Sequence, residues 1–385
     1  MIKIPEFVKK LRPYRAGKPI EELAREKNLN RIVKLASNEN PLGPSPKATE
    51  AIRAALPQLH RYTDPLSHDL VQAIAAKYDV QPQHIVCGHG TDSLIAYIVN
   101  AFTEEEDEIL TSEGTFIGLY VNAQKFGRTV KRIPLKNYGY DLKAIRQSIT
   151  DKTRMIYLAN PNNPTGTMFG KTEFESFMAA VPDDIMVILD EAYTTYAAEN
   201  PNYPNGVRYD YENMVVTRTL SKAYGLGGLR VGFAVGPDEV INALYKVKLP
   251  FEPNLLAQVG AIAALDDDEF LARTVKLNKE SLKIMAERFD ALGLAQVPTS
   301  ANFIMLVMPD ENFTDDFYLE CLNRGLIIRP LGAFGIPNGI RINSGTIDET
   351  EFALKIIEEV YGLLLKKYPN AAKMEKGKVD EARIV

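Results

Sequence analysis

Helical and strand-like apolar patterns alternate along the chain from about residue 45. The helical stretches are 46–56, 66–78, 92–102, 118–126 and 171–180, and the strand-like runs are 85–87, 108–111, 129–133, 155–159, 185–189, 214–219 and 231–235. Several of these runs are apolar at consecutive positions, as expected for strands that are buried on both faces. The alternation predicts an α/β domain with a mostly parallel sheet, whose ligand site lies at the carboxyl edge of the strands.

The pattern changes after Pro250. Two longer helical patterns at 254–265 and 269–292 precede scattered strands at 303–307, 326–329 and 340–343, and a last helix covers 349–365. This order of elements predicts a second, smaller α+β domain. We therefore divide the chain into an N-terminal arm that packs with the small domain and has one short helix near 21–27 (1–45), a large domain (46–250), a small domain (251–370) and a charged tail (371–385).

Composition narrows the class of protein. The 385 residues carry a formal net charge of −5, which argues against a mainly electrostatic nucleic-acid or anionic-membrane binder. Cys87 and Cys321 lie far apart in the sequence, which favours a reducing compartment. No secretory leader is recognisable at the N-terminus, and no run of about 18 apolar residues is present. We expect a cytoplasmic protein with a small-molecule substrate and no nucleic-acid or membrane partner.

Three successive strand-like runs end in polar, reactive sequence: Asn160-Pro-Asn-Asn-Pro-Thr-Gly166, Asp190-Glu-Ala-Tyr193 and Thr219-Leu-Ser-Lys222. In a parallel sheet these ends would lie side by side. A Lys, an Asp, an Asn and a Tyr at one edge suit pyridoxal phosphate, because this cofactor needs an amine for its aldehyde and a carboxylate for its ring nitrogen. The sequence therefore predicts a pyridoxal-phosphate site at this edge.

Two further segments could hold the phosphate of such a cofactor. Arg230 follows Lys222 by eight residues, and its guanidinium could grip a phosphate through two parallel hydrogen bonds. Gly88-His-Gly-Thr-Asp-Ser93 follows the 85–87 run and leads into a helix, where backbone N–H groups can surround an anion.

Two alternative interpretations, a metal site and a dinucleotide-binding site, have weaker support in the sequence. The four histidines, His60, His68, His84 and His89, fall within thirty positions, but their spacing fits no metal-ligand template, so we expect no metal. The Gly88–Ser93 segment is also similar to a dinucleotide-binding motif, but the third glycine of that motif is missing. A dinucleotide site would also leave Lys222 and Asp190 without a function.

These motifs resemble those of fold-type I pyridoxal-phosphate aminotransferases over nearly the whole chain. Within that group the chain most resembles the histidinol-phosphate aminotransferases. The segments that carry the resemblance are Arg12–Glu22, Lys34–Pro46, Arg61-Tyr-Thr-Asp64, Asn162–Gly166 and Thr219–Arg230. The resemblance implies a large domain with a mostly parallel sheet, a smaller α+β domain and an N-terminal arm. It also implies a homodimer that transfers an amino group between histidinol phosphate and 2-oxoglutarate in histidine biosynthesis.

The resemblance also implies roles for individual residues. Lys222 would bind the cofactor's aldehyde and then shuttle the substrate's proton, and Asp190 would pair with the ring nitrogen. Asn163 and Tyr193 would bind the phenolic oxygen, and Phe116 would stack on the ring. The phosphate would be held by Gly90, Thr91, Asp92, Thr219, Ser221 and Arg230, and by Tyr62 from the neighbouring subunit. Arg329 and Arg341 would bind the substrate's anionic groups, with Tyr14 and Asn38 lining the same pocket.

Some positions depart from the usual pattern of this family. Ser93 stands where glutamate is common, Phe116 where tyrosine is common, and Thr63 where proline is usual; the 332–338 loop also differs in detail. These departures border the substrate pocket and leave alternatives for the substrate. One is an aromatic aminotransferase acting on phenylalanine, tyrosine or tryptophan. A more remote one is a pyridoxal-phosphate lyase or decarboxylase. A non-catalytic regulator would need a DNA-binding module, for which the sequence gives no sign.

Overall fold

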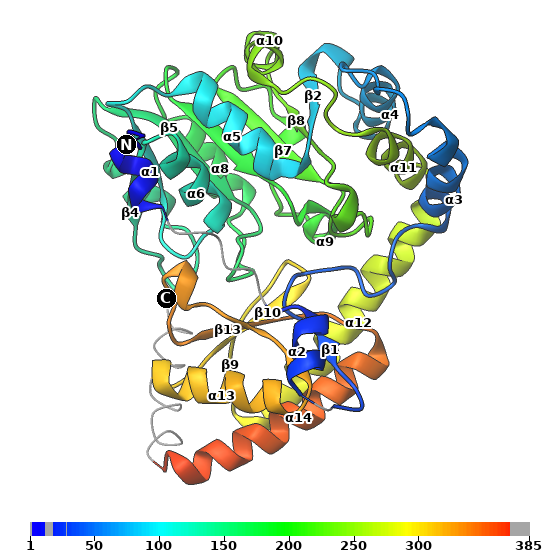
Figure 1. The fold of residues 1–385 in the computed structure, drawn as a ribbon. Coiled ribbons are helices and arrows are strands. Elements are labelled where there is room, and N and C mark those ends of the chain that lie inside the picture. Colours follow the sequence, from blue (N-terminus) through cyan, green and yellow to red (C-terminus); the bar gives the residue numbers. More distant parts are fainter. Residues whose placement is uncertain (1, 12–17, 28, 370–385) are drawn as a thin grey trace.

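The computed structural model describes residues 2–11, 18–27 and 29–369. Figure 1 shows a larger α/β domain at the top and a smaller domain below it, and the long helix α12 runs between the two. The helices are α1 (Glu6–Lys10), α2 (Ile20–Glu26), α3 (Pro46–Ala55), α4 (His68–Tyr78), α5 (Gly90–Phe102), α6 (Ile117–Lys125), α7 (Leu142–Gln147), α8 (Lys171–Met178), α9 (Thr194–Ala197), α10 (Asp238–Val247), α11 (Leu255–Leu265), α12 (Asp268–Leu292), α13 (Glu311–Asn323) and α14 (Ile347–Lys367).

The large domain is built on a seven-stranded sheet in the order β2-β8-β7-β6-β5-β3-β4. These strands are β2 (Ile85–Gly88), β3 (Glu108–Ser112), β4 (Thr129–Ile133), β5 (Thr153–Ala159), β6 (Met186–Asp190), β7 (Met214–Thr219) and β8 (Gly232–Val235). The apolar residues of β5 and β6 are buried and form one core cluster with α5 and α6. The predicted mostly parallel α/β sheet is confirmed.

One strand departs from the parallel pattern. β8 runs antiparallel to both of its neighbours, β2 and β7. The link from β7 to β8 holds only a short 3-10 turn, Gly227–Leu229, whereas a parallel connection needs a crossover that is usually a helix. The chain therefore turns back after β7, and this turn carries Ser221, Lys222 and Arg230.

The small domain contains a four-stranded antiparallel sheet in the order β12-β13-β10-β9. Its strands are β9 (Ala295–Val297), β10 (Phe303–Val307), β12 (Arg329–Pro330) and β13 (Gly339–Asn343). A separate parallel pair joins β1 (Val33–Lys34) of the arm to β11 (Leu326–Ile327). The single strand predicted at 326–329 is thus wrong in detail, because its two halves pair with different partners.

Several elements were not predicted from the sequence. They are the helices α1, α7, α9, α10 and α13 and the short strands β1 and β9. The helix predicted near 21–27 is found at Ile20–Glu26. Within the described ranges, no helix combines the length and the apolar character needed to cross a bilayer. The same residues contain no group of three or more His, Cys, Asp or Glu placed to hold a metal ion.

Candidate active site

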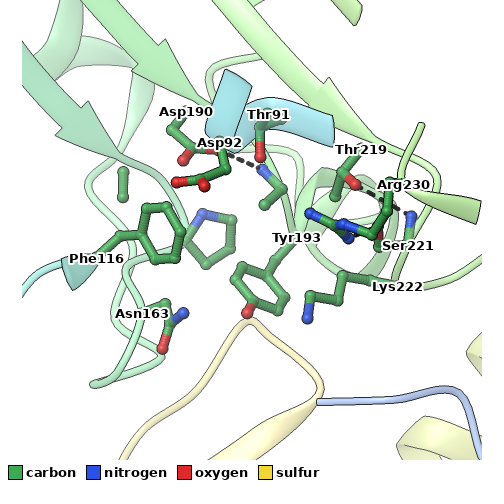
Figure 2. Close-up of a pocket in the computed structure, with 13 residues that line it drawn as sticks. Thr91, Asp92, Phe116, Asn163, Asp190, Tyr193, Thr219, Ser221, Lys222 and Arg230 are labelled. Carbon is green, nitrogen blue, oxygen red and sulfur yellow. Dashed lines mark hydrogen bonds between the residues drawn. The ribbon is translucent and has the colours of Figure 1, made fainter. Parts of the chain in front are cut away.

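The three polar strand ends meet at one edge of the large sheet. β5, β6 and β7 are neighbours, with Ala159 opposite Asp190 and Asp190 opposite Thr217. Beyond this edge lies a cavity of about 190 Å³, shown in Figure 2. Its lining is Thr91, Asp92, Phe116, Ala159, Pro161, Asn163, Asp190, Ala192, Tyr193, Thr219, Ser221, Lys222 and Arg230. The structure therefore brings the three strand ends to one cavity, as the sequence predicts.

Lys222 projects into the cavity from the turn after β7 (Figure 2). Its Nζ donates a hydrogen bond to the backbone oxygen of Ser37, 3.2 Å away, in the N-terminal arm. Burial, reinforced by the positive charge of Arg341, lowers the pKa of Lys222 to about 8. A substantial fraction of this amine is therefore neutral, and so nucleophilic, near physiological pH.

The pH dependence of cofactor capture should report this shift. Below a pKa of about 8, the neutral fraction of the Lys222 amine rises tenfold per pH unit, and above it the fraction is constant. We expect the rate at which the apo-protein develops visible absorbance with pyridoxal phosphate to rise and then level off near pH 8, measured by stopped-flow. Free lysine, with a side-chain pKa near 10.4, serves as the control. A rate that keeps rising to pH 10 would contradict the assignment.

Asp190 lies at the end of β6, opposite the backbone of β5. Its Oδ2 accepts a 2.6 Å hydrogen bond from the hydroxyl of Tyr157, and its Oδ1 accepts one from the backbone N–H of Ala192. Burial raises the pKa of Asp190 to about 6, although both hydrogen bonds act in the opposite direction. A buried carboxylate in this position calls for a cationic partner such as a protonated ring nitrogen.

Tyr157 was not found by sequence reasoning. It is a fully buried tyrosine that stands between Ile156 and Leu158 in β5. A buried phenol usually has a hydrogen-bond partner, so the lone hydroxyl in this run was the available signal.

Part of the cavity wall is rich in groups that bind anions, and Figure 2 shows Thr219, Ser221 and Arg230 together there. α5 begins at Gly90, which places Thr91 and Asp92 in its first turn, where free backbone N–H groups and the helix dipole favour a phosphate. Arg230 Nη1 donates to the backbone oxygen of Gly227 and, at 3.4 Å, to Ser221 Oγ. Thr219 Oγ1 accepts from the backbone N–H of Ser221.

Gly90 itself is required to be a glycine. Its φ is +78°, and a Cβ at this position would lie 2.8 Å from Nη2 of Arg230. The residue is absent from the cavity lining, but its lack of a side chain lets the Arg230 guanidinium approach the start of α5.

The side of the cavity that faces the small domain combines polar groups from distant segments. Asn38 Nδ2 donates a 2.7 Å hydrogen bond to the hydroxyl of Tyr193. Arg341, in β13, donates from Nη1 to Asn163 Oδ1 and from Nη2 to the backbone oxygen of Ala36. Asn38, Tyr193, Asn163 and Arg341 are thus gathered at one place. Figure 2 shows Phe116 on the side of the cavity away from Arg230.

Arg329 is the cross-strand neighbour of Arg341 in the small sheet. The ring of Phe334 lies near both guanidinium groups, 5.8 Å from Cζ of Arg329 and 6.0 Å from Cζ of Arg341. No hydrogen bond or ion pair to the Arg329 side chain is found among the described residues. Two cations on one face of the small domain are suited to bind anionic substituents of a substrate.

One predicted residue, Tyr62, lies away from this site, and another, Tyr14, cannot be placed. Tyr62 is 85% exposed and stacks on Phe251 at 4.6 Å between ring centroids, away from the lining of the pocket. Its predicted role was in the neighbouring subunit, so it stays a prediction. Tyr14 lies outside the described residues.

The donors present fit pyridoxal phosphate. A half-buried amine, a buried carboxylate, an aromatic ring and a group of phosphate-binding donors correspond in kind to the aldehyde, ring nitrogen, ring face and phosphate of that cofactor. Lys222, Asp190 and Arg230 would respectively hold the first, second and last of these groups.

This fold and this set of donors together define the class of fold-type I pyridoxal-phosphate enzymes. A family model described as aminotransferase class I and II matches residues 30–357. Histidinol-phosphate aminotransferase 2 of Pasteurella multocida is 42% identical over 361 residues, which is 94% of this chain and 98% of that protein. The histidinol-phosphate aminotransferase of Moorella thermoacetica is 37% identical over 361 residues, covering 93% of each. The chain belongs to the aminotransferase class I and II family.

A solved structure has a closely similar fold. The crystal structure of histidinol-phosphate aminotransferase from Sinorhizobium meliloti, in complex with pyridoxal-5'-phosphate, matches with a TM-score of 0.88 and 27% identity. The match covers 94% of this chain and 99% of that one. The predicted fold type and family are confirmed by these comparisons.

Proposed function

We propose that this protein is a pyridoxal-phosphate-dependent aminotransferase that moves an amino group between histidinol phosphate and 2-oxoglutarate, a reaction of histidine biosynthesis. The observation that carries the proposal is the placement of Lys222 and Asp190 in one cavity, with Arg341 at its border. Relatives at 37–42% identity over most of their length bear the name histidinol-phosphate aminotransferase, which supports this substrate. The cytoplasm, where such a biosynthetic enzyme would act, is part of the same proposal.

The chemistry divides between the cofactor and the chain. When bound, pyridoxal phosphate supplies an aldehyde that takes up the amino group and a ring that accepts electrons. Lys222 would hold the cofactor through Nζ, and as a free amine the same atom would take up the proton from the substrate's α-carbon and give it back. The lowered pKa of Lys222 suits this task, because an amine with a pKa near 8 can both take and return a proton near neutral pH.

Asp190 and the small-domain arginines have fixed electrostatic roles. The Asp190 carboxylate would keep the ring nitrogen of a bound cofactor protonated, and Tyr157 and the Ala192 N–H orient that carboxylate. Arg341 and Arg329 receive the carboxylate of glutamate in one half of the cycle and the phosphate of histidinol phosphate in the other. A guanidinium can serve both anions because its planar donors match either group.

The experiment that tests this proposal is a comparison of amino donors with 2-oxoglutarate as acceptor. We expect kcat/KM for histidinol phosphate to exceed that for phenylalanine, tyrosine and tryptophan by on the order of 10²-fold, as when a charged group loses its partner. A preference for phenylalanine would identify an aromatic aminotransferase instead. Product release without any dependence on a 2-oxo acid would identify a lyase or decarboxylase.

We also propose a homodimer with shared active sites. Large apolar side chains are exposed in two segments, 56–66 and 249–251, and the two segments meet where Tyr62 stacks on Phe251. The exposed members of this group are Leu56, Leu59, Tyr62, Leu66, Leu249 and Phe251. Such exposure is unusual for a free surface and is typical of an interface.

Substituting Tyr62 tests the dimer. If the Tyr62 hydroxyl reaches the cofactor phosphate of the neighbouring subunit, Tyr62→Phe should weaken pyridoxal-phosphate retention by about tenfold, the value of one hydrogen bond to a charged group. Leu319→Ala, which alters an exposed apolar side chain on α13 in the small domain, is the matched control and should change nothing. Cofactor dissociation constants and the mass in light scattering are the measurements. A fully active monomer would contradict the proposal.

A further inference from the structure

A second, larger cavity of about 880 Å³ lies between α12 and the large domain. We call it the α12 groove. Its large-domain side comes from the end of α4, from α9 and from the turn after β7, and its other side comes from residues 268–283 of α12. None of the residues given a role in the proposed aminotransfer reaction lines it.

The α12 groove has an apolar floor and a cationic rim. Tyr78, Tyr224, Leu271 and Val275 supply apolar and aromatic surface. Five cations and three carboxylates line the cavity, so the excess charge is positive; the cations are Lys77, Lys276, Lys279, Lys283 and Arg218. Lys276, Lys279 and Lys283 are three and four residues apart and therefore share one face of α12.

The lysines that line the α12 groove differ in whether a carboxylate already pairs with them. Lys77 pairs with Asp268, and Lys279 pairs with Glu199. Lys276 has no ion pair within the described part of the chain. An incoming anion would therefore find Lys276 available.

Arg218 gives the groove a buried cation. Its side chain is 4% exposed and forms an ion pair with the fully buried Glu191, which accepts from both Nε and Nη2. The guanidinium also lies 4.8 Å from the centre of the Tyr78 ring. Nη1 has no hydrogen-bond partner among the described residues, although Arg218 lines the cavity. One donor of a nine-tenths-buried guanidinium is thus left for a ligand.

The α12 groove and the active-site cavity share a wall. Tyr193 lines the active site, whereas the next two residues, Thr194 and Thr195, line the groove. The same alternation occurs at Thr219 and Arg218. Glu191, which pairs with Arg218, directly follows Asp190 in the sequence. A ligand bound at Arg218 would therefore act on the ends of β6 and β7, which carry active-site residues.

We propose that the α12 groove is a second binding site, for a small organic acid with an aromatic or branched apolar body. The acid group would lie between Arg218 Nη1 and Lys276, and the apolar body would lie on Tyr78, Tyr224 and Leu271. A purely apolar ligand would leave the rim charges unused, and an amine would be repelled by them. This inference does not depend on the identity of the amino donor.

Calorimetric titration of the holoenzyme with 1-naphthoate tests the site. We expect saturable binding to the wild type, and at least fivefold weaker binding of the neutral amide, 1-naphthamide. Lys276→Glu should weaken 1-naphthoate binding at least fivefold. Lys355→Glu makes the same charge change at an exposed position of α14 and should alter the affinity less than twofold.

The outcomes separate the groove from the active site. Equal binding to Lys276→Glu and Lys355→Glu, or no binding to the wild type, would overturn the proposal. Loss of binding in Arg341→Gln with no loss in Lys276→Glu would place 1-naphthoate in the active site and would also overturn it. Donor specificity is measured in a separate assay, so failure here leaves the proposed aminotransfer reaction standing.

Discussion

Replacing Lys222 with alanine is expected to remove the visible absorbance of the bound cofactor and to lower turnover by at least about 10⁴-fold, the upper range for a lost proton-transfer group. The alanine lacks both the amine that captures the cofactor and the base that moves the α-proton. The absorbance spectrum of the purified variant and single-turnover rates with the best donor are the measurements.

Two comparisons make the Lys222 result specific. Lys355→Ala removes an exposed lysine from α14 and should leave the spectrum and the rate unchanged. Thermal unfolding of the apo-proteins guards against misfolding, because loss of a partly desolvated amine with a lowered pKa should not destabilise the fold. Substantial turnover in a folded Lys222→Ala protein would refute the assignment.

Replacing Asp190 with asparagine should lower kcat by about 10²–10³-fold, as when a preorganised electrostatic contact is removed. Asparagine keeps the shape of the side chain and can still accept from Tyr157, but it carries no charge to hold the ring nitrogen protonated. The cofactor should remain bound, since Lys222 and the phosphate cradle are unchanged. Rapid-reaction rates of the half-reaction with the amino donor are the measurement.

A graded comparison isolates the charge of Asp190. Tyr157→Phe removes the 2.6 Å hydrogen bond but leaves the carboxylate, so its rate should fall by about tenfold, consistent with one hydrogen bond to a charged group. If Asp190→Asn lost no more activity than Tyr157→Phe, the charge would have no special role, and the proposed function of Asp190 would be wrong.

Much of the large domain could be predicted because its pattern is regular. Buried parallel strands such as β5 and β6 are apolar at consecutive positions, and their carboxyl ends meet by the geometry of the sheet. The direction of β8 could not be predicted, because it depends on how the turn containing Lys222 folds back. The split between β11 and β12 depends likewise on two different partner strands.

Part of the candidate site could be predicted from local sequence, and part of it could not. Lys222, Asp190 and Arg230 follow strands or turns with recognisable sequence, so their gathering was predictable. The contact of Lys222 with Ser37 spans 185 positions, and that of Arg341 with Asn163 spans 178. Such contacts arise from the packing of the arm and the small domain against the sheet, and no local pattern contains them.

Lys222 is the one amine expected to carry the cofactor, and borohydride reduction followed by peptide mapping can identify that amine. Reduction fixes the cofactor to whichever amine holds it, and mass spectrometry of the digest then locates the added pyridoxyl group. We expect one modified peptide, with the mass increment on Lys222. A stoichiometric label on any other lysine, or no label on protein purified with added pyridoxal phosphate, would contradict it.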